Sequence, residues 1–165
     1  MRYSIVIFAI LLSFPLLAQE TTNSRRAAKA FREAKSSVAV QDYSAAKTHL
    51  NEALLIDDHF VEAWILLGDV NIGLGDKLKG IEAYKKSIPL APRFSFPMYY
   101  RLALAEHSLG EYSNALQHIR KYMRFKSISE KYRKRANAIK KSCEFSINSK
   151  NNPVSFDPEN LGPTI

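Results

Sequence analysis

The sequence predicts an all-α protein built as a solenoid of three helix pairs, followed by a capping helix and an extended C-terminal tail. Three observations lead to this prediction. The chain repeats itself at spacings of 34 and then 35 residues, apolar residues recur at helical spacing inside each repeat, and small residues recur at fixed positions. With 165 residues, the chain has the length of one domain, which excludes a large enzyme.

Residues 1–18 have the layout of a secretory signal peptide. Arg2 precedes a stretch of about 13 mainly apolar residues, interrupted by Ser13 and Pro15, that ends at Ala18. A helix that crosses a membrane needs roughly 20 apolar residues, so export and cleavage are favoured over an anchor. A buried first helix is the alternative. The mature protein is expected to start near Gln19, outside the cytoplasm.

Three repeats are predicted within residues 24–128, at about 27–60, 61–95 and 96–128. Aligning them brings residues of similar size into common columns: Ala46, Gly80 and Ala115; Leu50, Tyr84 and Ile119; Ala53, Ser87 and Tyr122. Antiparallel helices approach closely only where a side chain is nearly absent. Gly68, Gly80 and Ala103 are therefore interpreted as packing residues.

The middle repeat shows how each repeat divides into two helices. Helical spacing of the apolar positions runs as far as Asn71, breaks at Gly75 and Asp76, and resumes after them. Pro89 and Pro92 are expected to end the second helix. Each repeat is therefore two helices joined by a tight turn.

A capping helix is predicted over residues 129–146. Residues 127–130 read Ser-Ile-Ser-Glu, the form of a capping box at a helix start. Apolar or small residues then follow along one face: Tyr132, Ala136, Ile139 and Cys143. A helix with a polar back covers the open apolar end of a stack of repeats. Residues 147–165 contain several Asn, Pro and Gly residues and are predicted to form an extended tail or linker.

The repeats resemble those of the tetratricopeptide repeat (TPR) family. The middle repeat carries the family's tryptophan, leucine–glycine pair, later aromatic residue and final proline: Trp64, Leu67, Gly68, Tyr84 and Pro92. The third repeat is similar, whereas the first is recognised chiefly by register, since Ala30 stands in place of tryptophan. Asn71 replaces a tyrosine, which is expected to loosen the packing of the middle pair. The resemblance implies a right-handed solenoid whose first helices line a concave groove.

The resemblance also implies which residues line this groove. The family's groove positions correspond here to a mixed apolar and polar set: Phe31, Lys35, Ile65, Asp69, Tyr100, Leu104 and His107. Such a groove suits an extended or helical peptide. Phe31 and Lys35 stand where a clamp for C-terminal carboxylates would need lysine and asparagine, so binding of chaperone tails is not supported. If the register is shifted by one, Phe31, Ile65 and Leu104 are helix-packing residues instead.

The tail suggests a more specific relationship. Residues 143–145 and 152–163 resemble the junction found in cell-envelope proteins of the Bacteroidetes, in which a signal peptide and TPR region precede a WD40-like β-propeller and an OmpA-like peptidoglycan-binding domain. The sequence ends at Ile165, where the propeller would begin. A fragment, a truncated product and a stand-alone relative are all open, and peptidoglycan binding is not carried over.

Positive charge is concentrated near the C-terminal end of the solenoid. Residues 111–150 hold 11 Lys or Arg against 3 Asp or Glu. The candidate basic docking face consists of Arg120, Lys121, Arg124, Lys131, Arg133, Lys134, Arg135, Lys140 and Lys141. It is interpreted either as a solvated helix face or as a surface for an anionic partner, envelope polymer or lipid headgroup layer. No nucleic-acid-binding motif accompanies it.

The sequence lacks the motifs of catalytic, cofactor and metal sites. It has no phosphate-binding Gly-rich loop, no Gly-x-Ser-x-Gly and no His-Glu-x-x-His, and its four histidines are widely spaced. Cys143 lies on the apolar stripe of the capping helix and is interpreted as a core residue. Asp57 and Asp58 are interpreted as caps of the next helix. The protein is therefore predicted to have no enzymatic activity, no cofactor and no metal site.

These expectations combine into one predicted function: an exported TPR scaffold that mediates protein–protein interaction in the bacterial cell envelope. The periplasm is the expected location, with outer-membrane association as a variant. The expected partner is a protein or peptide, with no nucleic acid and no small-molecule substrate. Two alternatives stay open: a structural tether that orients a downstream envelope domain, and an accessory subunit that docks through its basic end on an anionic partner or membrane surface.

Overall fold

The structure confirms an all-α fold. The computed structural model describes residues 22–91 and 96–153, and in these residues it contains seven α-helices and no strand. The predicted signal peptide, Pro92 and most of the predicted tail lie outside the described residues. No helix in the described ranges is both long enough and apolar enough to cross a membrane.

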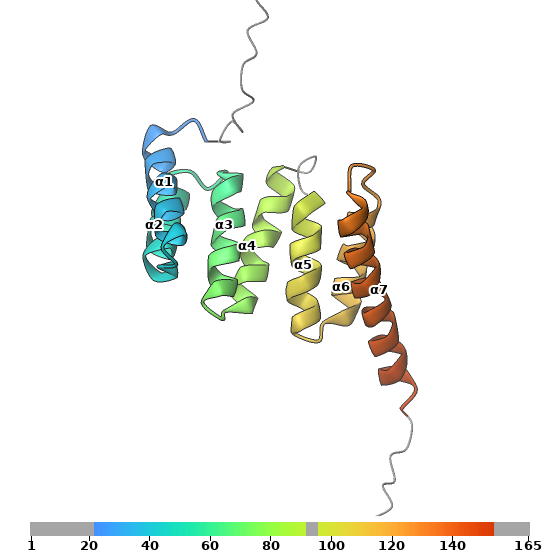
Figure 1. Cartoon of the computed structure of the whole chain (residues 1–165). Helices are drawn as coiled ribbons and strands as arrows, with labels where there is room; N and C mark the ends of the chain where they lie inside the picture. Colours follow the sequence, from blue (N-terminus) through green and yellow to red (C-terminus); the bar gives the residue numbers. More distant parts are fainter. Residues whose placement is uncertain (1–21, 92–95, 154–165) are drawn as a thin grey trace, which may run out of the picture.

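The helices form three consecutive antiparallel pairs and a final single helix (Figure 1). Their bounds are α1 Arg25–Ala39, α2 Tyr43–Ile56, α3 Val61–Gly73, α4 Lys77–Leu90, α5 Phe96–Ser108, α6 Tyr112–Met123 and α7 Glu130–Asn151. Each helix packs on the next one in the chain, and α7 packs on α6 and also touches α5. The first helices of the pairs are therefore α1, α3 and α5, and α7 continues their series.

A residue with left-handed backbone conformation makes the turn inside each pair. Gly75 and Gly110 have φ values of 85° and 77°, and Gln41 takes the corresponding place in the first pair with φ 60°. Glycine adopts this conformation at low cost, whereas other residues adopt it rarely. Asp42 and Asp76 then cap α2 and α4 by accepting backbone N–H groups three residues on, at 2.9 and 3.2 Å. The break predicted at Gly75 and Asp76 is therefore confirmed.

The buried residues form three adjoining clusters along the solenoid. The first lies between α1, α2 and α3, the second between α3, α4 and α5, and the third between α5, α6 and α7. Small residues allow the close approach of helices that the repeat alignment predicts: Ala46, Gly80 and Ala115 are all buried. Because each cluster is shared with the next pair, no pair buries its apolar face alone.

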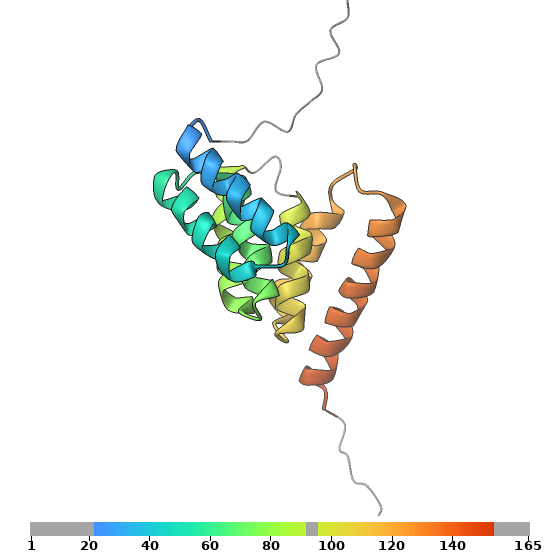
Figure 2. The same cartoon turned by 60° about the vertical axis from the view of Figure 1, so that its left-hand side comes forward.

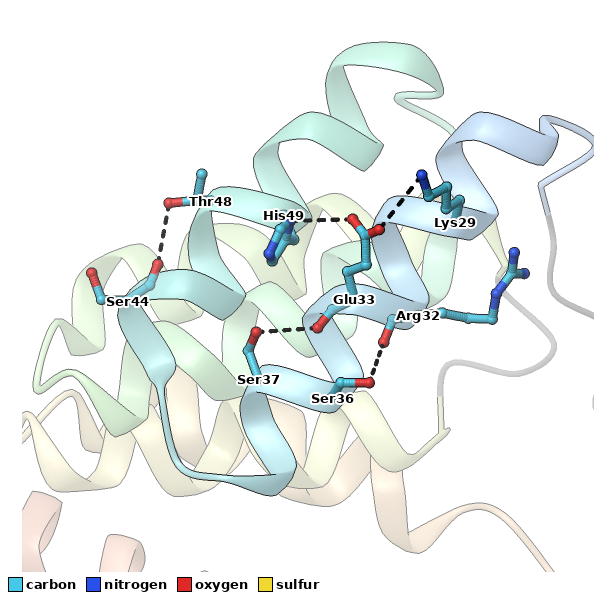
Figure 3. Close-up of polar contacts among 8 residues, drawn as sticks. All are labelled: Lys29, Arg32, Glu33, Ser36, Ser37, Ser44, Thr48 and His49. Atoms are coloured by element: carbon cyan, nitrogen blue, oxygen red, sulfur yellow. Dashed lines mark hydrogen bonds and ion pairs between the residues drawn. The ribbon is translucent and has the colours of Figure 1, made fainter.

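Among the contacts drawn in Figure 3, that between Glu33 and His49 links the two helices of the first pair, and the others lie within one helix. The Glu33 carboxylate of α1 lies 3.6 Å from Nδ1 of His49 in α2 and 3.8 Å from Nζ of Lys29. Ser36 and Ser37 donate hydrogen bonds to carbonyls four residues earlier, at 3.2 and 3.1 Å. The two helices of the first pair thus pack through alanine and leucine side chains, and Glu33 adds a polar contact to His49.

Two predicted helix ends differ from the structure. Pro89 lies inside the last turn of α4, which ends at Leu90, one residue later. Its ring removes one backbone N–H from the helix, and only one residue follows it in the helix. The second difference concerns α7, the last helix. It ends at Asn151, five residues beyond the predicted end at residue 146. Ile147 follows Cys143 by four residues and continues the apolar stripe, so the predicted tail begins later than residue 147.

Two predicted caps are also wrong. The N-cap of α7 is Ser129, with no side-chain cap hydrogen bond, rather than Ser127. The reason is that Ile128 packs into the third cluster, which turns the chain inward before the helix starts. The N-cap of α3 is Phe60, and the Asp57 carboxylate instead accepts the backbone N–H of His59 at 3.0 Å.

Candidate functional site

The groove positions predicted from the family fall into different environments. Lys35 is exposed on α1, and Ile65 of α3 is half-buried against the second cluster. On α5, Leu104 is 43% exposed and Tyr100 is half-buried. Among these four residues, Leu104 is therefore the apolar side chain with the clearly exposed surface.

Phe31 does not line the groove. Its side chain is 6% exposed and packs in the first cluster, with its ring 4.8 Å from that of Phe60 at an angle of 56°. Phe60 precedes α3 directly, so the two rings join the first and second pairs. Phe31 is therefore a core residue, the role that the alternative register assigned to it, and Lys35 lies over the outer side of its ring.

Asp69 is engaged within the protein rather than free for a ligand. Its carboxylate accepts a hydrogen bond from Tyr84 of α4 at 2.6 Å and pairs with Arg101 of α5. Burial, together with the hydrogen bond to Asp69, raises the pKa of the Tyr84 hydroxyl. This network joins three helices and fixes the guanidinium of Arg101 at the edge of the α5 surface.

A hollow of about 510 Å³ opens beside Tyr100 and Leu104. It lies where α5 and α7 begin, the region in which their ribbons diverge in Figure 2. Its lining residues come from α5, α6, α7 and the connection before α7: Pro97, Tyr100, Arg101, Leu104, Tyr122, Ser127, Ile128, Ser129 and Tyr132. The volume is within the range of small ligand sites, which are mostly apolar with a few polar groups.

Three tyrosines form one wall of this hollow. The Tyr100 ring lies 5.1 Å from that of Tyr122 and 6.1 Å from that of Tyr132, the latter edge to face. Burial raises the pKa of the Tyr122 hydroxyl, so this phenol stays protonated and neutral at physiological pH. Tyr132 is 45% exposed. The wall therefore offers aromatic faces and edges to an apolar side chain, with polar groups at its rim.

Sequence reasoning missed α7 as part of this site. The sequence pattern predicts Tyr132 on the buried stripe and Ile128 at the helix start, yet both residues line the hollow together with Tyr100. A signal was present in the sequence. A helix that follows three helix pairs takes the place of the first helix of a fourth pair, so an aromatic residue in its first turn is a candidate groove residue. His107 lies elsewhere: its Nε2 is 2.8 Å from Oγ of Ser142, which joins α5 to the middle of α7.

The predicted basic residues do not form one face. Arg133 donates to the backbone carbonyls of Met123 and Phe125 at 3.4 Å and so fastens α7 to the end of α6. Glu144 lies 2.9 Å from Arg120 and 3.8 Å from Lys140. Lys121 and Arg124 lie in the last turn and at the C-cap of α6. The remaining cations are on α7, where neighbouring residues of a helix are turned by about 100° from one another.

Two further polar groups carry no site. Asp57, Asp58 and His59 have potential ligand atoms within 4.8 Å of one another, but they are consecutive residues of an exposed loop, and His59 Nδ1 already lies 2.6 Å from Asp58. Cys143 is fully buried, and burial raises the pKa of its thiol. This matches its interpretation as a core residue.

Comparison with known proteins is consistent with the repeat pattern. The chain matches the tetratricopeptide repeat family over residues 61–94 and 96–127. No curated protein matches the chain.

Solved structures show the fold of the longer region. The Sgt2 TPR domain from Aspergillus fumigatus is 17% identical, with a TM-score of 0.65 over 85% of this chain and 93% of that chain. The type III secretion chaperone SycD of Yersinia enterocolitica, in complex with a peptide of the translocator YopD, is 12% identical, with a TM-score of 0.67 over 75% and 96%. The first TPR of Spaghetti (RPAP3), bound to the HSP90 peptide SRMEEVD, is 11% identical, with a TM-score of 0.68 over 78% and 98%.

Proposed function

We propose that this chain, which carries tetratricopeptide repeats over residues 61–94 and 96–127, is a scaffold that binds a segment of another protein. The observation that carries the proposal is the hollow between α5 and α7, whose tyrosine wall and exposed Leu104 offer an apolar anchor point on the side of the first helices. The lining supports a role in binding, because it contains aromatic and aliphatic side chains, with hydroxyl groups and one ion-paired arginine beside them.

The chemistry of the hollow indicates the kind of segment bound. One aliphatic or aromatic side chain fits against Tyr100, Leu104 and Tyr132, and such buried anchors dominate binding energy in peptide complexes. The Ser127 and Ser129 hydroxyls at the rim suit backbone groups of the segment. Two of the structural neighbours were solved with a bound peptide, which supports this class of partner.

The test is a selection of peptides from a displayed library on the immobilised protein, followed by affinity measurement. Selected peptides are expected to share an apolar anchor residue, and Leu104→Glu is expected to weaken their binding at least tenfold, because a carboxylate replaces the apolar wall. Leu55→Glu is the matched control, since Leu55 is equally apolar and 88% exposed on α2, far from the hollow. Equal binding by both variants would show that the hollow is not the peptide site.

The proposed setting is the bacterial cell envelope. The signal-peptide layout of residues 1–18 supports export to the periplasm, and the tail motif supports a link to outer-membrane proteins of the OmpA type. Expression of the full chain with a C-terminal tag, followed by fractionation and N-terminal sequencing, tests this. A periplasmic product starting near Gln19 is expected, and a cytoplasmic product that retains Arg2 would contradict export.

Docking through the basic end is the second candidate. Arg120, Arg124 and Lys140 surround a shallow hollow of about 350 Å³ over Met123, with Glu144 as the nearby carboxylate. Co-sedimentation with anionic lipid vesicles would test it: Arg124→Glu should release the protein, whereas reversal of Lys29 in α1 should not. Absence of binding to anionic vesicles and to anionic envelope polymers would remove this candidate.

A further inference from the structure

A second hollow is lined mainly by the second helices α2 and α4 and by α3, whereas the first is lined mainly by α5 and the region around the start of α7. Its volume is about 400 Å³. Its floor comes from α3 and its walls from α2 and α4: Lys47, Asn51, Trp64, Leu67, Asn71, Lys79, Glu82, Ala83 and Lys86. None of these residues lines the hollow between α5 and α7, so the two sites are separate.

The floor holds a polar group whose hydrogen bonding is incomplete. Asn71 is 3% exposed, and its side-chain oxygen Oδ1 accepts no hydrogen bond from the described residues. Leaving a buried acceptor unsatisfied is unfavourable. The Asn71 side chain lines the hollow. A half-turn about its last side-chain bond exchanges the positions of Oδ1 and Nδ2 and so presents the acceptor to a donor from outside.

The next repeat shows how the same position is partly satisfied inside the chain. Glu106 follows Asn71 by 35 residues, takes the corresponding place on α5, and is fully buried. There, Nδ1 of His118 in α6 lies 2.7 Å from Oε2 of Glu106. Oε1 has Nζ of Lys85 in α4 at 3.9 Å and accepts no hydrogen bond from the described residues. The helices that flank Asn71 place no such group against it, and a hollow is found there instead.

The walls and rim define what fits. Trp64, Leu67 and Ala83 provide apolar surface. Lys47 of α2 and Lys86 of α4 stand at the rim, and Glu82 offsets only part of their positive charge. The apolar interior suits an aromatic ring, and the acceptor at the floor suits a hydrogen-bond donor at the far end of that ring. The lysines at the mouth suit acidic groups beside the ring.

We propose that this hollow binds a tyrosine side chain from an acidic segment of a partner protein. The tyrosine ring lies against Trp64 and Leu67, and its hydroxyl donates a hydrogen bond to Oδ1 of Asn71. Carboxylates of the neighbouring residues pair with Lys47 and Lys86. The protein thereby contacts two partner segments at once, one in each hollow.

Trp64 is the single tryptophan of the chain, so its fluorescence reports directly on the hollow. The probe is the blocked peptide Glu-Glu-Tyr-Glu-Glu, titrated into the protein with selective excitation of tryptophan. A saturable change is expected. The matched peptide with Phe in place of Tyr is expected to bind about threefold to tenfold more weakly, because it lacks the hydroxyl donor. A peptide with Lys in place of every Glu is expected not to bind.

Three variants locate the binding. Asn71→Leu keeps the size of the side chain and is expected to remove the preference for the Tyr peptide over the Phe peptide. Reversal of both Lys47 and Lys86 to Glu is expected to weaken binding about tenfold and to remove its salt dependence. Leu104→Glu, in the other hollow, is expected to leave binding unchanged.

Three results would overturn the proposal: no fluorescence change with the Tyr peptide, equal affinities of the parent for the Tyr and Phe peptides, or unchanged binding after reversal of the two lysines. The lysine variant changes only surface charge, so it keeps the test valid even if Asn71→Leu disturbs the fold. Loss of binding in Leu104→Glu would place the acidic peptide in the hollow between α5 and α7 instead, and would also overturn it.

Discussion

Replacing Gly68 with alanine is predicted to destabilise the protein, although alanine is the better helix former. Gly68 lies in α3, directly under the ring of Tyr84 from α4. A Cβ atom at residue 68 would lie 2.2, 2.4 and 2.9 Å from the Cε1, Cδ1 and Cζ atoms of that ring. Ordinary contacts between carbon atoms are about 3.5–4.0 Å, so the ring must move.

The magnitude follows from how firmly the ring is held. Tyr84 is 3% exposed, and its hydroxyl donates a hydrogen bond to Asp69, which also pairs with Arg101. Moving the ring therefore disturbs a network that joins three helices. Overpacking of this kind costs about 1–3 kcal/mol, and three contacts below 3.0 Å place Gly68→Ala near the upper end. Alanine returns about 1 kcal/mol of helix propensity, which leaves a net loss of about 2 kcal/mol.

The assay is urea unfolding followed by far-ultraviolet circular dichroism, with Tyr84→Leu as a second background. In the parent, Gly68→Ala should lower the free energy of unfolding by about 2 kcal/mol and Tm by roughly 5–10 °C. In the Tyr84→Leu background the ring is gone, so the same substitution should be neutral or stabilising, and the difference measures the coupling. If Gly68→Ala were as stable as the parent with Tyr84 present, the argument from close packing would be refuted.

Three other predictions rest on buried groups. Phe31→Ala should lower the free energy of unfolding by about 3–5 kcal/mol, because it removes the ring packed on Phe60; a loss below 1 kcal/mol in urea unfolding would place Phe31 at the surface. His118→Ala should cost about 1–3 kcal/mol by leaving the carboxylate of Glu106 without its close partner, and replacing both by leucine should recover much of the loss; equal stability of His118→Ala and parent would contradict the buried pair. Iodoacetamide should label Cys143 slowly in the folded protein and readily in urea, because burial keeps the thiol covered and raises its pKa; fast labelling of the folded protein would show that α7 detaches from α6.

Local signals in the sequence predicted the helix pairs well. Gly75 and Asp76 act on the backbone within a few residues, because glycine tolerates the left-handed turn and aspartate caps the helix that follows. Their effects on backbone conformation do not depend on distant packing. The columns of small and apolar residues located the first pair, whose residues fit the family least, because Ala46, Leu50 and Ala53 keep the register of the repeat.

Signals that depend on neighbours misled the sequence reading. Phe31 occupies a groove position by register, but Phe60 covers it from the next pair. Ser127 fits a capping box, but burial of Ile128 delays the start of α7. The predicted basic face included Arg133, which instead donates to carbonyls at the end of α6. In each case a contact made by a residue outside the local pattern decides the outcome.

The sequence by itself determined the period of the repeat, the alternation of helices and turns, and the excess of positive charge near the C-terminal end, since these are properties of neighbouring residues. Only the tertiary structure decided which side chains line open space. The hollow beside Tyr100 exists because α7 diverges from α5, and the hollow over Asn71 exists because α2 and α4 supply no partner for its amide. The burial of a side chain depends on which helices pack against its position. That packing involves residues far apart in the chain, so a local sequence pattern does not determine it.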